Sequence, residues 1–388
     1  MVTRNQGDRN KPAAAGAPPA RIEVLGEHVV TAREPNTRTA VAVGPRLALA
    51  NDDDIVCSYM LQSKLAVNDF VPMISRSRDG GRTWHDQGSI WPDDIERWSI
   101  FGSISRAPDG DLMFFGARTP IDTAGEPNWS GATMGLKQNE LIWSRSRDAG
   151  STWSKPIPIP MPIAGSAEAA GPICVTRAGR WLICYAPYNT FERDLAVDRQ
   201  QLALLASDDS GATWNYEPLM RFAEAESGSA EAWVVELADG RLLATCWHVD
   251  HTDSREYPNP YALSSDGGRT WIGPNSTGVL GQSTSLAALP DGRALMLYNQ
   301  RKHGQPGVYL AIARPDERSL NIEVNEPVWL ARTTTQHGGQ GDHSNWEDFS
   351  FGEPAAVLLP DGDVLVALWC QQPDFQGIQC LRVHLKTG

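Results

Sequence analysis

One octapeptide occurs four times along this chain, and it limits the possible folds more than any other feature of the sequence. The copies are SRDGGRTW at 77–84, SRDAGSTW at 146–153, SDDSGATW at 207–214 and SSDGGRTW at 264–271. The Asp in third position can bond to the backbone of its own turn, and the Gly two residues later supplies a positive φ. The final Trp begins a strand and can pack against a neighbouring unit. The octapeptide therefore predicts a hairpin tip with a structural role.

A second repeat alternates with the first and consists of an apolar run, a tight turn and another apolar run. Its copies are ISRAPDGDLMFF at 104–115, VTRAGRWLICY at 175–185, VVELADGRLLATC at 234–246, LAALPDGRALMLY at 286–298, AVLLPDGDVLVALW at 356–369 and a looser LALANDDDIVCSY at 47–59. Asp-Gly, or a close relative of it, between two apolar runs is a strong hairpin signal. The sequence therefore predicts six hairpins.

Together the two repeats predict six four-stranded units over residues 40–388, which is a six-bladed β-propeller of the all-β class. The fifth octapeptide is degenerate, with only Asp316 left, and the sixth is missing because the sequence ends soon after Leu385. The last blade then lacks a strand, and we expect the run from Arg21 to Val30 to close it as the outermost strand. We expect residues 1–20 to form a disordered lead-in and residues 21–388 to form a single propeller domain.

Charge and composition argue against several classes of function. A formal net charge of −13 is unsuited to nucleic-acid or anionic-membrane partners. No run approaches the roughly 18 apolar residues that cross a bilayer, and the first 20 residues lack the apolar centre of a signal peptide. The six cysteines fall in predicted strands, where free thiols behave as small hydrophobic side chains. We expect a cytoplasmic protein that binds neither membrane nor nucleic acid.

The SxDxGxTW hairpins on a six-bladed propeller resemble the sialidase (neuraminidase) superfamily, and the resemblance spans residues 35–385. It implies a carbohydrate substrate and a site at one face of the ring. The octapeptide is specific for the architecture but not for the reaction, since related hairpins occur in other glycosidases, in lyases and in propellers without catalysis. Fold analogy alone does not assign the activity.

Two glutamates occupy equivalent positions when the blades are aligned on their turn glycines. Glu231 lies nine residues before Gly240, and Glu353 lies nine residues before Gly362. SAEAWVVELADGRLL resembles the sialidase segment whose Glu assists a tyrosine nucleophile, and the resemblance gives this role to Glu231. It also implies a nucleophilic tyrosine at the position of Glu353. A carboxylate therefore replaces the tyrosine.

The arginines that bind the carboxylate of sialic acid in this superfamily are also changed. In GPRLALANDD, Arg46 is displaced by about three places, and Trp247 and His248 stand where a second arginine is expected. Arg301 is the candidate for the third. These losses predict a substrate other than a conventional sialoside.

We therefore expect an exo-acting glycoside hydrolase that cleaves a terminal sugar with paired carboxylates. Its candidate catalytic residues are Glu231, Glu353 and Asp69, the last preceding the third strand of the first blade. The candidate substrate-binding residues are Arg97, Arg118, Arg193, His248, Tyr257, Arg301, His303 and Trp346. Glu168, Tyr188, His251, Gln282 and His343 are expected on the same face. No cofactor or metal is expected, although the HVDH spacing of His248 and His251 offers possible zinc ligands.

Two other functions remain open from the sequence. A uronate lyase requires a group that neutralises the substrate carboxylate and a His or Tyr that removes a proton, and Arg118, Arg301, His248 and Tyr257 offer both. A carbohydrate-binding propeller without catalysis is the third possibility.

Overall fold

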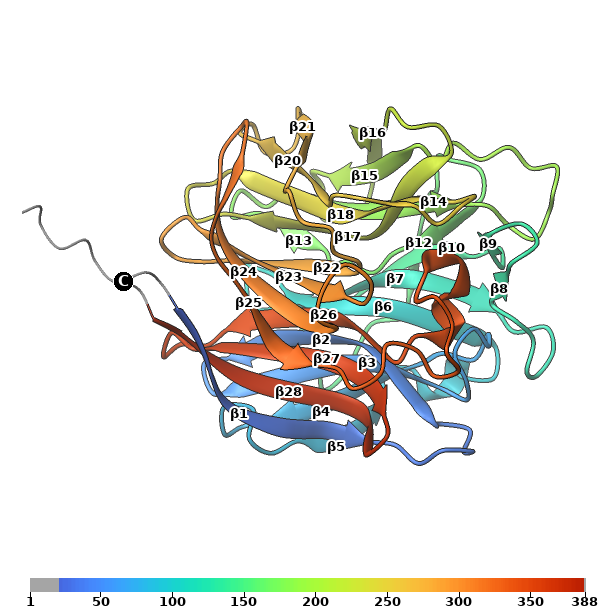
Figure 1. Ribbon diagram of the computed structural model, residues 1–388, viewed down its shortest axis with the longest axis horizontal. Coiled ribbons are helices and arrows are strands. Elements are labelled where there is room, and N and C mark those ends of the chain that lie inside the picture. The colour runs from blue at the N-terminus through green and yellow to red at the C-terminus, as the bar shows by residue number, and fades with distance from the viewer. Residues whose placement is uncertain (1–20, 387–388) are drawn as a thin grey trace, which may run out of the picture.

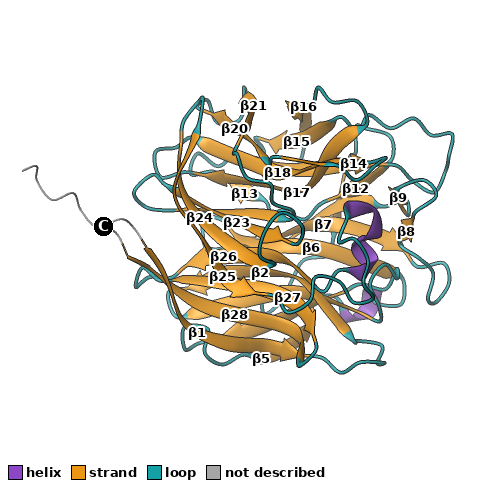
Figure 2. Cartoon of the chain, viewed as in Figure 1, coloured by secondary structure: helices purple, strands orange, loops and turns teal. Residues whose placement is uncertain are grey.

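The computed structural model describes residues 21–386, which form six antiparallel sheets arranged around a common centre and one small two-stranded sheet in an insertion (Figures 1 and 2). Each of the six larger sheets is one blade, which runs from an inner strand at the centre to an outer strand at the rim. The first blade contains β2 (Val41–Asn51), β3 (Asp54–Gln62), β4 (Val71–Ser77) and β5 (His85–Ser89). The second contains β6 (Trp98–Arg106), β7 (Leu112–Pro120), β10 (Glu140–Ser146) and β11 (Ile157–Ile159). The predicted six-bladed all-β propeller is thereby confirmed.

The inner edge of the third blade is divided between two short strands. This blade contains β12 (Ser166–Glu168), β13 (Cys174–Val175), β14 (Trp181–Tyr188), β15 (Gln201–Ser207) and β16 (Asn215–Arg221), with β12 and β13 both paired to β14. The fourth blade contains β17 (Ser227–Glu236), β18 (Leu242–Asp250), β19 (Glu256–Tyr257), β20 (Pro260–Ser264) and β21 (Ile272–Ser276). The fifth contains β22 (Thr284–Ala288), β23 (Ala294–Gln300), β24 (Gly307–Pro315) and β25 (Leu320–Leu330).

The sixth blade closes the ring with strands from both ends of the described chain. It contains β26 (Phe351–Leu358), β27 (Val364–Gln372), β28 (Phe375–Lys386) and, outermost, β1 (Arg21–Ala32). β1 pairs with β28 from Arg21 opposite Lys386 to Ala32 opposite Gly377, and the two strands lie side by side in Figure 1. The predicted closure by the N-terminal strand is confirmed. The expected lead-in at 1–20 lies outside the described residues.

Both repeats form the turns predicted for them. In the first octapeptide, Asp79 accepts a 2.9 Å hydrogen bond from the Thr83 N–H and a 2.6 Å bond from the Thr83 hydroxyl, and Gly81 has φ 86°. The other three copies repeat these bonds, and each links the third strand of its blade to the fourth. Six apolar clusters fill the seams between adjacent blades, and Trp153 packs into the seam of the first and second.

Two insertions depart from the repeat and lie at the same end of the ring. The first carries β8 (Trp129–Ser130) and β9 (Gly135–Leu136) between β7 and β10, and the second carries the 3₁₀ helix η2 (His343–Asp348) before β26. A further 3₁₀ turn, η1 (Pro92–Asp94), precedes β6. Within residues 21–386 no helix is long and apolar enough to cross a membrane. All six cysteines are in the described part of the chain and are free thiols.

Candidate active site

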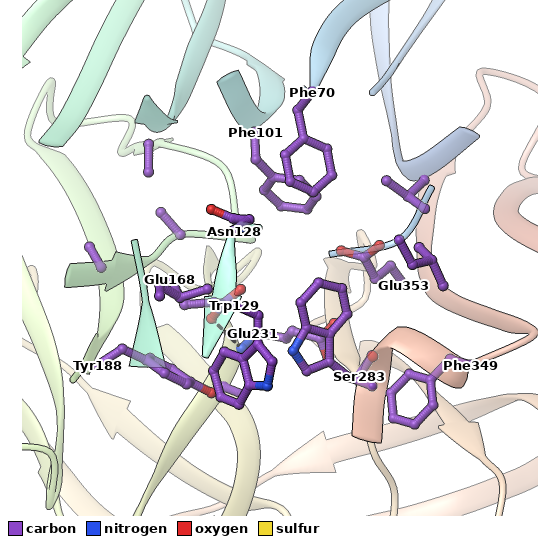
Figure 3. Close-up of a pocket in the computed structure, with 18 of the residues that line it drawn as sticks. Phe70, Phe101, Asn128, Trp129, Glu168, Tyr188, Glu231, Ser283, Phe349 and Glu353 are labelled. Carbon is purple, nitrogen blue, oxygen red and sulfur yellow. Dashed lines mark hydrogen bonds between the residues drawn. The ribbon is translucent and has the colours of Figure 1, made fainter. Parts of the chain in front are cut away.

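A pocket of about 170 Å³ lies at the centre of the ring, and all six blades contribute to its wall. The inner strands or the loops leading to them place Val43, Phe101, Glu168, Glu231, Ser283 and Glu353 on it. Figure 3 shows Glu168 and Glu231 close together on one side and Glu353 on the other. Since the third and sixth blades are opposite in a ring of six, Glu168 and Glu353 approach the centre from opposite sides.

A local backbone irregularity aims two of these carboxylates into the pocket. The register of β17 shifts between Ala230 and Trp233, and Glu231 has φ 49°. The register of β26 shifts in the same way between Gly352 and Ala355, and Glu353 has φ 48°. A β-bulge re-aims a side chain, and a positive φ strains a non-glycine residue, so such residues concentrate at functional sites. Two glutamates therefore share this uncommon conformation at equivalent positions, and both line the same pocket.

Glu168 and Glu231 are in direct contact through the backbone. The N–H of Glu231 donates a 2.7 Å hydrogen bond to Oε2 of Glu168, which reaches across from β12. Oε2 of Glu231 is buried and has no hydrogen-bond partner among residues 21–386. Glu168 thus supports the strained backbone at Glu231, while part of the Glu231 carboxylate is left for a ligand.

Burial and mutual repulsion raise the pKa values of the pocket carboxyls. For Glu231, burial followed by the charges of Glu353 and Glu168 raises the pKa to about 8. Burial raises the pKa of Glu168 to about 7, although the bond from the Glu231 N–H works in the other direction. Burial also raises the pKa of Glu353, but the Arg46 guanidinium opposes that rise most strongly. Glu231 is therefore the carboxyl best suited to carry a proton at neutral pH.

Two buried arginines stand beside the carboxylates, and both are already engaged. Arg46 donates to the carbonyl of Ala170 (2.9 Å) and to the hydroxyl of Ser103 (3.0 Å), and its Nη2 lies 3.8 Å from Oε1 of Glu353. Through these contacts Arg46 connects the first blade with the second, third and sixth blades. Arg301 donates to Oε1 of Gln282 and to the carbonyl of Phe351. Arg46 favours the ionised form of Glu353, so Glu231 is the more readily protonated of the two carboxyls.

Aromatic residues from the two insertions cover the pocket. Trp129 on β8 packs edge to face against His343 and Trp346 of η2, with ring centroids 6.0 and 6.2 Å apart. The hydroxyl of Tyr188 lies 2.6 Å from Nε2 of His343, and burial lowers the pKa of His343 to about 4. Phe70 and Phe101 form another part of the wall (Figure 3). Aromatic side chains therefore make up much of the wall around the carboxylates.

The structure brings together four of the residues predicted for the site. Glu231, Glu353, Arg301 and Trp346 line the pocket. Asp69 does not line it, because its carboxylate accepts a 2.5 Å hydrogen bond from the Ser63 hydroxyl.

The other predicted binding residues lie away from the pocket and have other partners or face solvent. Arg118 pairs with Glu140 at 2.7 Å and packs over Trp98, and His303 lies 2.6 Å from Glu256. Arg97 and Arg193 are exposed. His248 is sandwiched between Phe222 and Tyr257, with ring centroids 4.2 and 4.5 Å away. The groups proposed for a uronate lyase are therefore not assembled, since of the four only Arg301 reaches the pocket.

Glu168 was expected from the sequence on the same face of the ring as the candidate site residues, but without a role of its own. A signal for it exists, because the pentapeptide Gly-Ser-Ala-Glu-Ala occurs at 165–169 and again at 228–232, with Glu168 and Glu231 at the same place. Trp129, in contrast, lies in an insertion without any repeat, and no pattern indicates it. Within residues 21–386 no group of three or more His, Cys, Asp or Glu side chains is arranged to hold a metal ion.

Comparison with known proteins agrees with this architecture. The sequence matches the model of the BNR repeat-like domain over residues 104–366, and no curated protein matches the sequence of the chain. A protein of unknown function from Dyadobacter fermentans superposes with a TM-score of 0.69 at 20% identity, covering 94% of this chain and 99% of that one.

Two structures with stated activities are also similar. The Hadza microbial sialidase Hz136 has a TM-score of 0.63 at 18% identity, covering 89% of this chain and 66% of that one. The α-L-arabinanase of Penicillium chrysogenum, complexed with arabinobiose, has a TM-score of 0.62 at 15% identity, covering 93% and 98%. At these identities the likeness establishes the fold and leaves the reaction to the residues of the pocket.

Proposed function

Because the chain belongs to the family of BNR repeat-like domains, we propose that it is an exo-acting glycoside hydrolase that cleaves a terminal sugar other than a conventional sialoside. The observation that carries the proposal is the pair of bulged glutamates, Glu231 and Glu353, at equivalent positions on inner strands around one pocket. Glycosidic bond cleavage uses two carboxyl groups, one protonated and one ionised. The similar folds of a sialidase and an arabinanase support the reaction class.

The environments of the two carboxyls support a different role for each. Glu231, with a pKa raised to about 8 by burial and by its acidic neighbours, acts as the general acid that protonates the departing glycosidic oxygen. Glu353, 3.8 Å from Arg46, acts in ionised form at the anomeric carbon, as nucleophile or as the base that activates water. Glu168 holds the backbone of Glu231 and acts through it.

The aromatic wall of the pocket is the basis for exo action. Trp129, His343 and Trp346 pack together on the wall of a pocket of about 170 Å³, and we propose that this wall admits only the end of a glycan chain. The cytoplasmic location expected from the sequence stays a prediction.

A panel of 4-nitrophenyl glycosides, including a sialoside and a uronide, tests the reaction directly. We expect release of nitrophenol from at least one neutral glycoside and, on the alkyl glycoside of the same sugar, a fall of about 10²–10⁴-fold in Glu231→Gln. Glu236→Gln is the matched control, because Glu236 lies on the same strand but outside the pocket and accepts a 2.8 Å bond from the Arg177 N–H. Failure to hydrolyse any glycoside would favour a binding propeller, and a product with new ultraviolet absorbance from a C=C bond would favour a lyase.

A further inference from the structure

Three indole N–H groups on the pocket wall have no well-formed hydrogen bond in the described part of the chain, although the Trp369 N–H lies near enough to the Glu353 carboxyl to lower its pKa. Trp129, Trp247 and Trp369 line the pocket and are 8%, 2% and 3% exposed, and within residues 21–386 none of their Nε1 atoms has a hydrogen-bond partner. A buried donor without an acceptor costs about 1–3 kcal/mol, so three around one cavity require an explanation. A ligand with several oxygen acceptors provides one.

Gln62 and Glu231 add the complementary acceptors. Gln62 lines the same pocket, is 1% exposed, and has no partner in the described structure for either its amide nitrogen or its amide oxygen. Oε2 of Glu231 is also unpaired. A hydroxyl group both donates and accepts, so a set of mixed donors and acceptors matches a polyhydroxylated molecule better than a ligand that only accepts or only donates.

The wall offers an anionic ligand no cation with free terminal nitrogens. Arg301 is the one arginine or lysine on it within the described residues, and its terminal nitrogens donate to Gln282 and Phe351 while its plane packs over Phe349 at 3.8 Å. Only its Nε–H is left without a partner among residues 21–386, and this adds one more donor to the unpaired groups of the wall. His343 is buried and its pKa is lowered to about 4, so it is neutral. Glu353, which Arg46 favours in its ionised form, repels an anion. Trp247 also stands where the sialidase resemblance implies an arginine, so a neutral donor replaces a cationic one.

A cationic ligand also fits poorly, although aromatic side chains and carboxylates are its usual partners. The unpaired groups are mainly donors, and an ammonium group cannot accept from an indole N–H. Oxygen-rich, uncharged ligands satisfy the largest number of these groups.

We propose that the pocket recognises an uncharged monosaccharide unit, whose hydroxyl groups accept hydrogen bonds from Trp129, Trp247 and Trp369 and pair with Gln62, and that it rejects sialic and uronic acids. This inference rests on the proposed function for the fate of the sugar, but it concerns binding and is tested separately. The aromatic wall contacts the apolar faces of the sugar ring, and the indole N–H groups donate hydrogen bonds to its hydroxyl groups.

Equilibrium binding of free sugars to the full-length protein tests the proposal, with tryptophan fluorescence as the readout and L-arabinose, D-galactose, D-glucuronate and N-acetylneuraminate as probes. We expect a neutral sugar to bind at least about tenfold more tightly than either acid. Tighter binding of an acid, tighter binding of tetramethylammonium, or no binding of any neutral sugar at millimolar concentration would overturn the proposal.

Substitutions that remove the indole N–H identify the donors. Trp247→Phe and Trp369→Phe keep an aromatic ring but remove the N–H, and each is expected to weaken binding of the neutral sugar about 5- to 20-fold. Trp271→Phe is the matched control, because its Nε1 is equally unpaired but belongs to an octapeptide away from the pocket. Unchanged affinity in both pocket variants, with unchanged melting temperature, would contradict the assignment.

The two proposals fail in distinguishable ways. If neutral sugars bind and no glycoside is cleaved, the hydrolase is wrong and the recognition stands. If a sialoside or uronide is cleaved in preference to neutral glycosides, the hydrolase stands and the recognition is wrong.

Discussion

The backbone N–H of Glu231 donates a 2.7 Å hydrogen bond to the carboxylate of Glu168, which joins two acidic residues on adjacent blades of the propeller. The bond stabilises a residue with φ 49° and brings a second negative charge close to its side chain. One contact therefore fixes the direction of the Glu231 carboxyl and contributes to its affinity for a proton.

Removing the charge of Glu168 is expected to shift the pH dependence of the reaction. Burial, Glu353 and Glu168 together raise the pKa of Glu231 to about 8, so wild-type kcat/KM falls as pH rises through that value and the acid loses its proton. Glu168→Gln keeps an oxygen for the Glu231 N–H but removes one repelling charge. We expect the pH at which kcat/KM falls to decrease by about 0.5–1 unit, and kcat/KM is measured from pH 5 to 10. If that pH is unchanged or increases, Glu168 does not raise the pKa of Glu231 in this way.

Arg46 is expected to be a large single contributor to stability. It is 2% exposed and joins Ser103, Ala170 and Glu353 from three other blades. Arg46→Met leaves these acceptors buried without their donor and is expected to cost about 3–5 kcal/mol in the free energy of unfolding. Arg221→Met is the control, since its pair with Asp198 is exposed and is worth about 1 kcal/mol or less. The free energy of unfolding of both variants is measured in denaturant. Equal decreases in the two variants would show that the contacts of Arg46 between blades do not stabilise the fold.

The octapeptide aspartates are expected to stabilise the fold in a pH-dependent way. Hydrogen bonds from the Thr213 hydroxyl and N–H, at 2.6 and 2.8 Å, lower the pKa of Asp209 to about 2. A carboxyl whose pKa is lower in the folded state stabilises the fold at pH values above its unfolded-state pKa of about 3.9. This stabilisation is lost as the pH falls through the folded-state pKa. The difference in melting temperature between wild type and Asp209→Ala should therefore be largest at pH 6 and decrease towards pH 2.

The neighbouring Asp208 is the matched control for this effect. It lies in the same turn and faces Arg180 at 3.7 Å instead of the turn backbone. Asp208→Ala should change the melting temperature little at any pH. A difference for Asp209→Ala that does not vary with pH would assign its effect to packing alone.

The closing contact between β1 and β28 depends on a glycine. Gly377 has φ 144°, and a Cβ there would collide with the carbonyl oxygen of Thr31 on β1. Gly377→Ala is expected to loosen β1 and to increase proteolytic cleavage within residues 21–40. Gly362→Ala is the control, because Gly362 also has a positive φ, 89°, but no atom lies within 4 Å of the added carbon. Equal protease resistance in the two variants would contradict this account of ring closure.

The repeats made the architecture predictable because each copy contains the residues that form its own turn. Ser, Asp, Gly and Thr in an octapeptide specify a turn locally, so blade number and strand order follow from counting turns. The same alignment located Glu231 and Glu353, since their positions on a strand are fixed relative to the glycine that ends it. The repeated pentapeptide that contains Glu168 and Glu231 was the remaining usable signal.

Residues in loops were not predictable by that alignment. Asp69, Arg118 and His248 share a face of the ring with the pocket, but local partners such as Ser63, Glu140 and Phe222 determine where their side chains lie. Trp129 comes from an insertion with no counterpart in other blades. Arg46, interpreted as a displaced ligand-binding arginine, is instead a buried tie between blades, because its acceptors come from segments far away in sequence.

The leaving-group dependence of two variants separates the roles of Glu231 and Glu353. On the glycoside that wild type cleaves fastest, kcat/KM is compared for 2,4-dinitrophenyl and alkyl aglycones. A dinitrophenolate departs without protonation, so Glu231→Gln should retain most activity on it and lose about 10²–10⁴-fold on the alkyl glycoside, while Glu353→Gln should lose activity on both. Equal losses for the two aglycones in Glu231→Gln, or full activity in Glu353→Gln, would contradict the assignment of Glu231 as acid and Glu353 as its ionised partner.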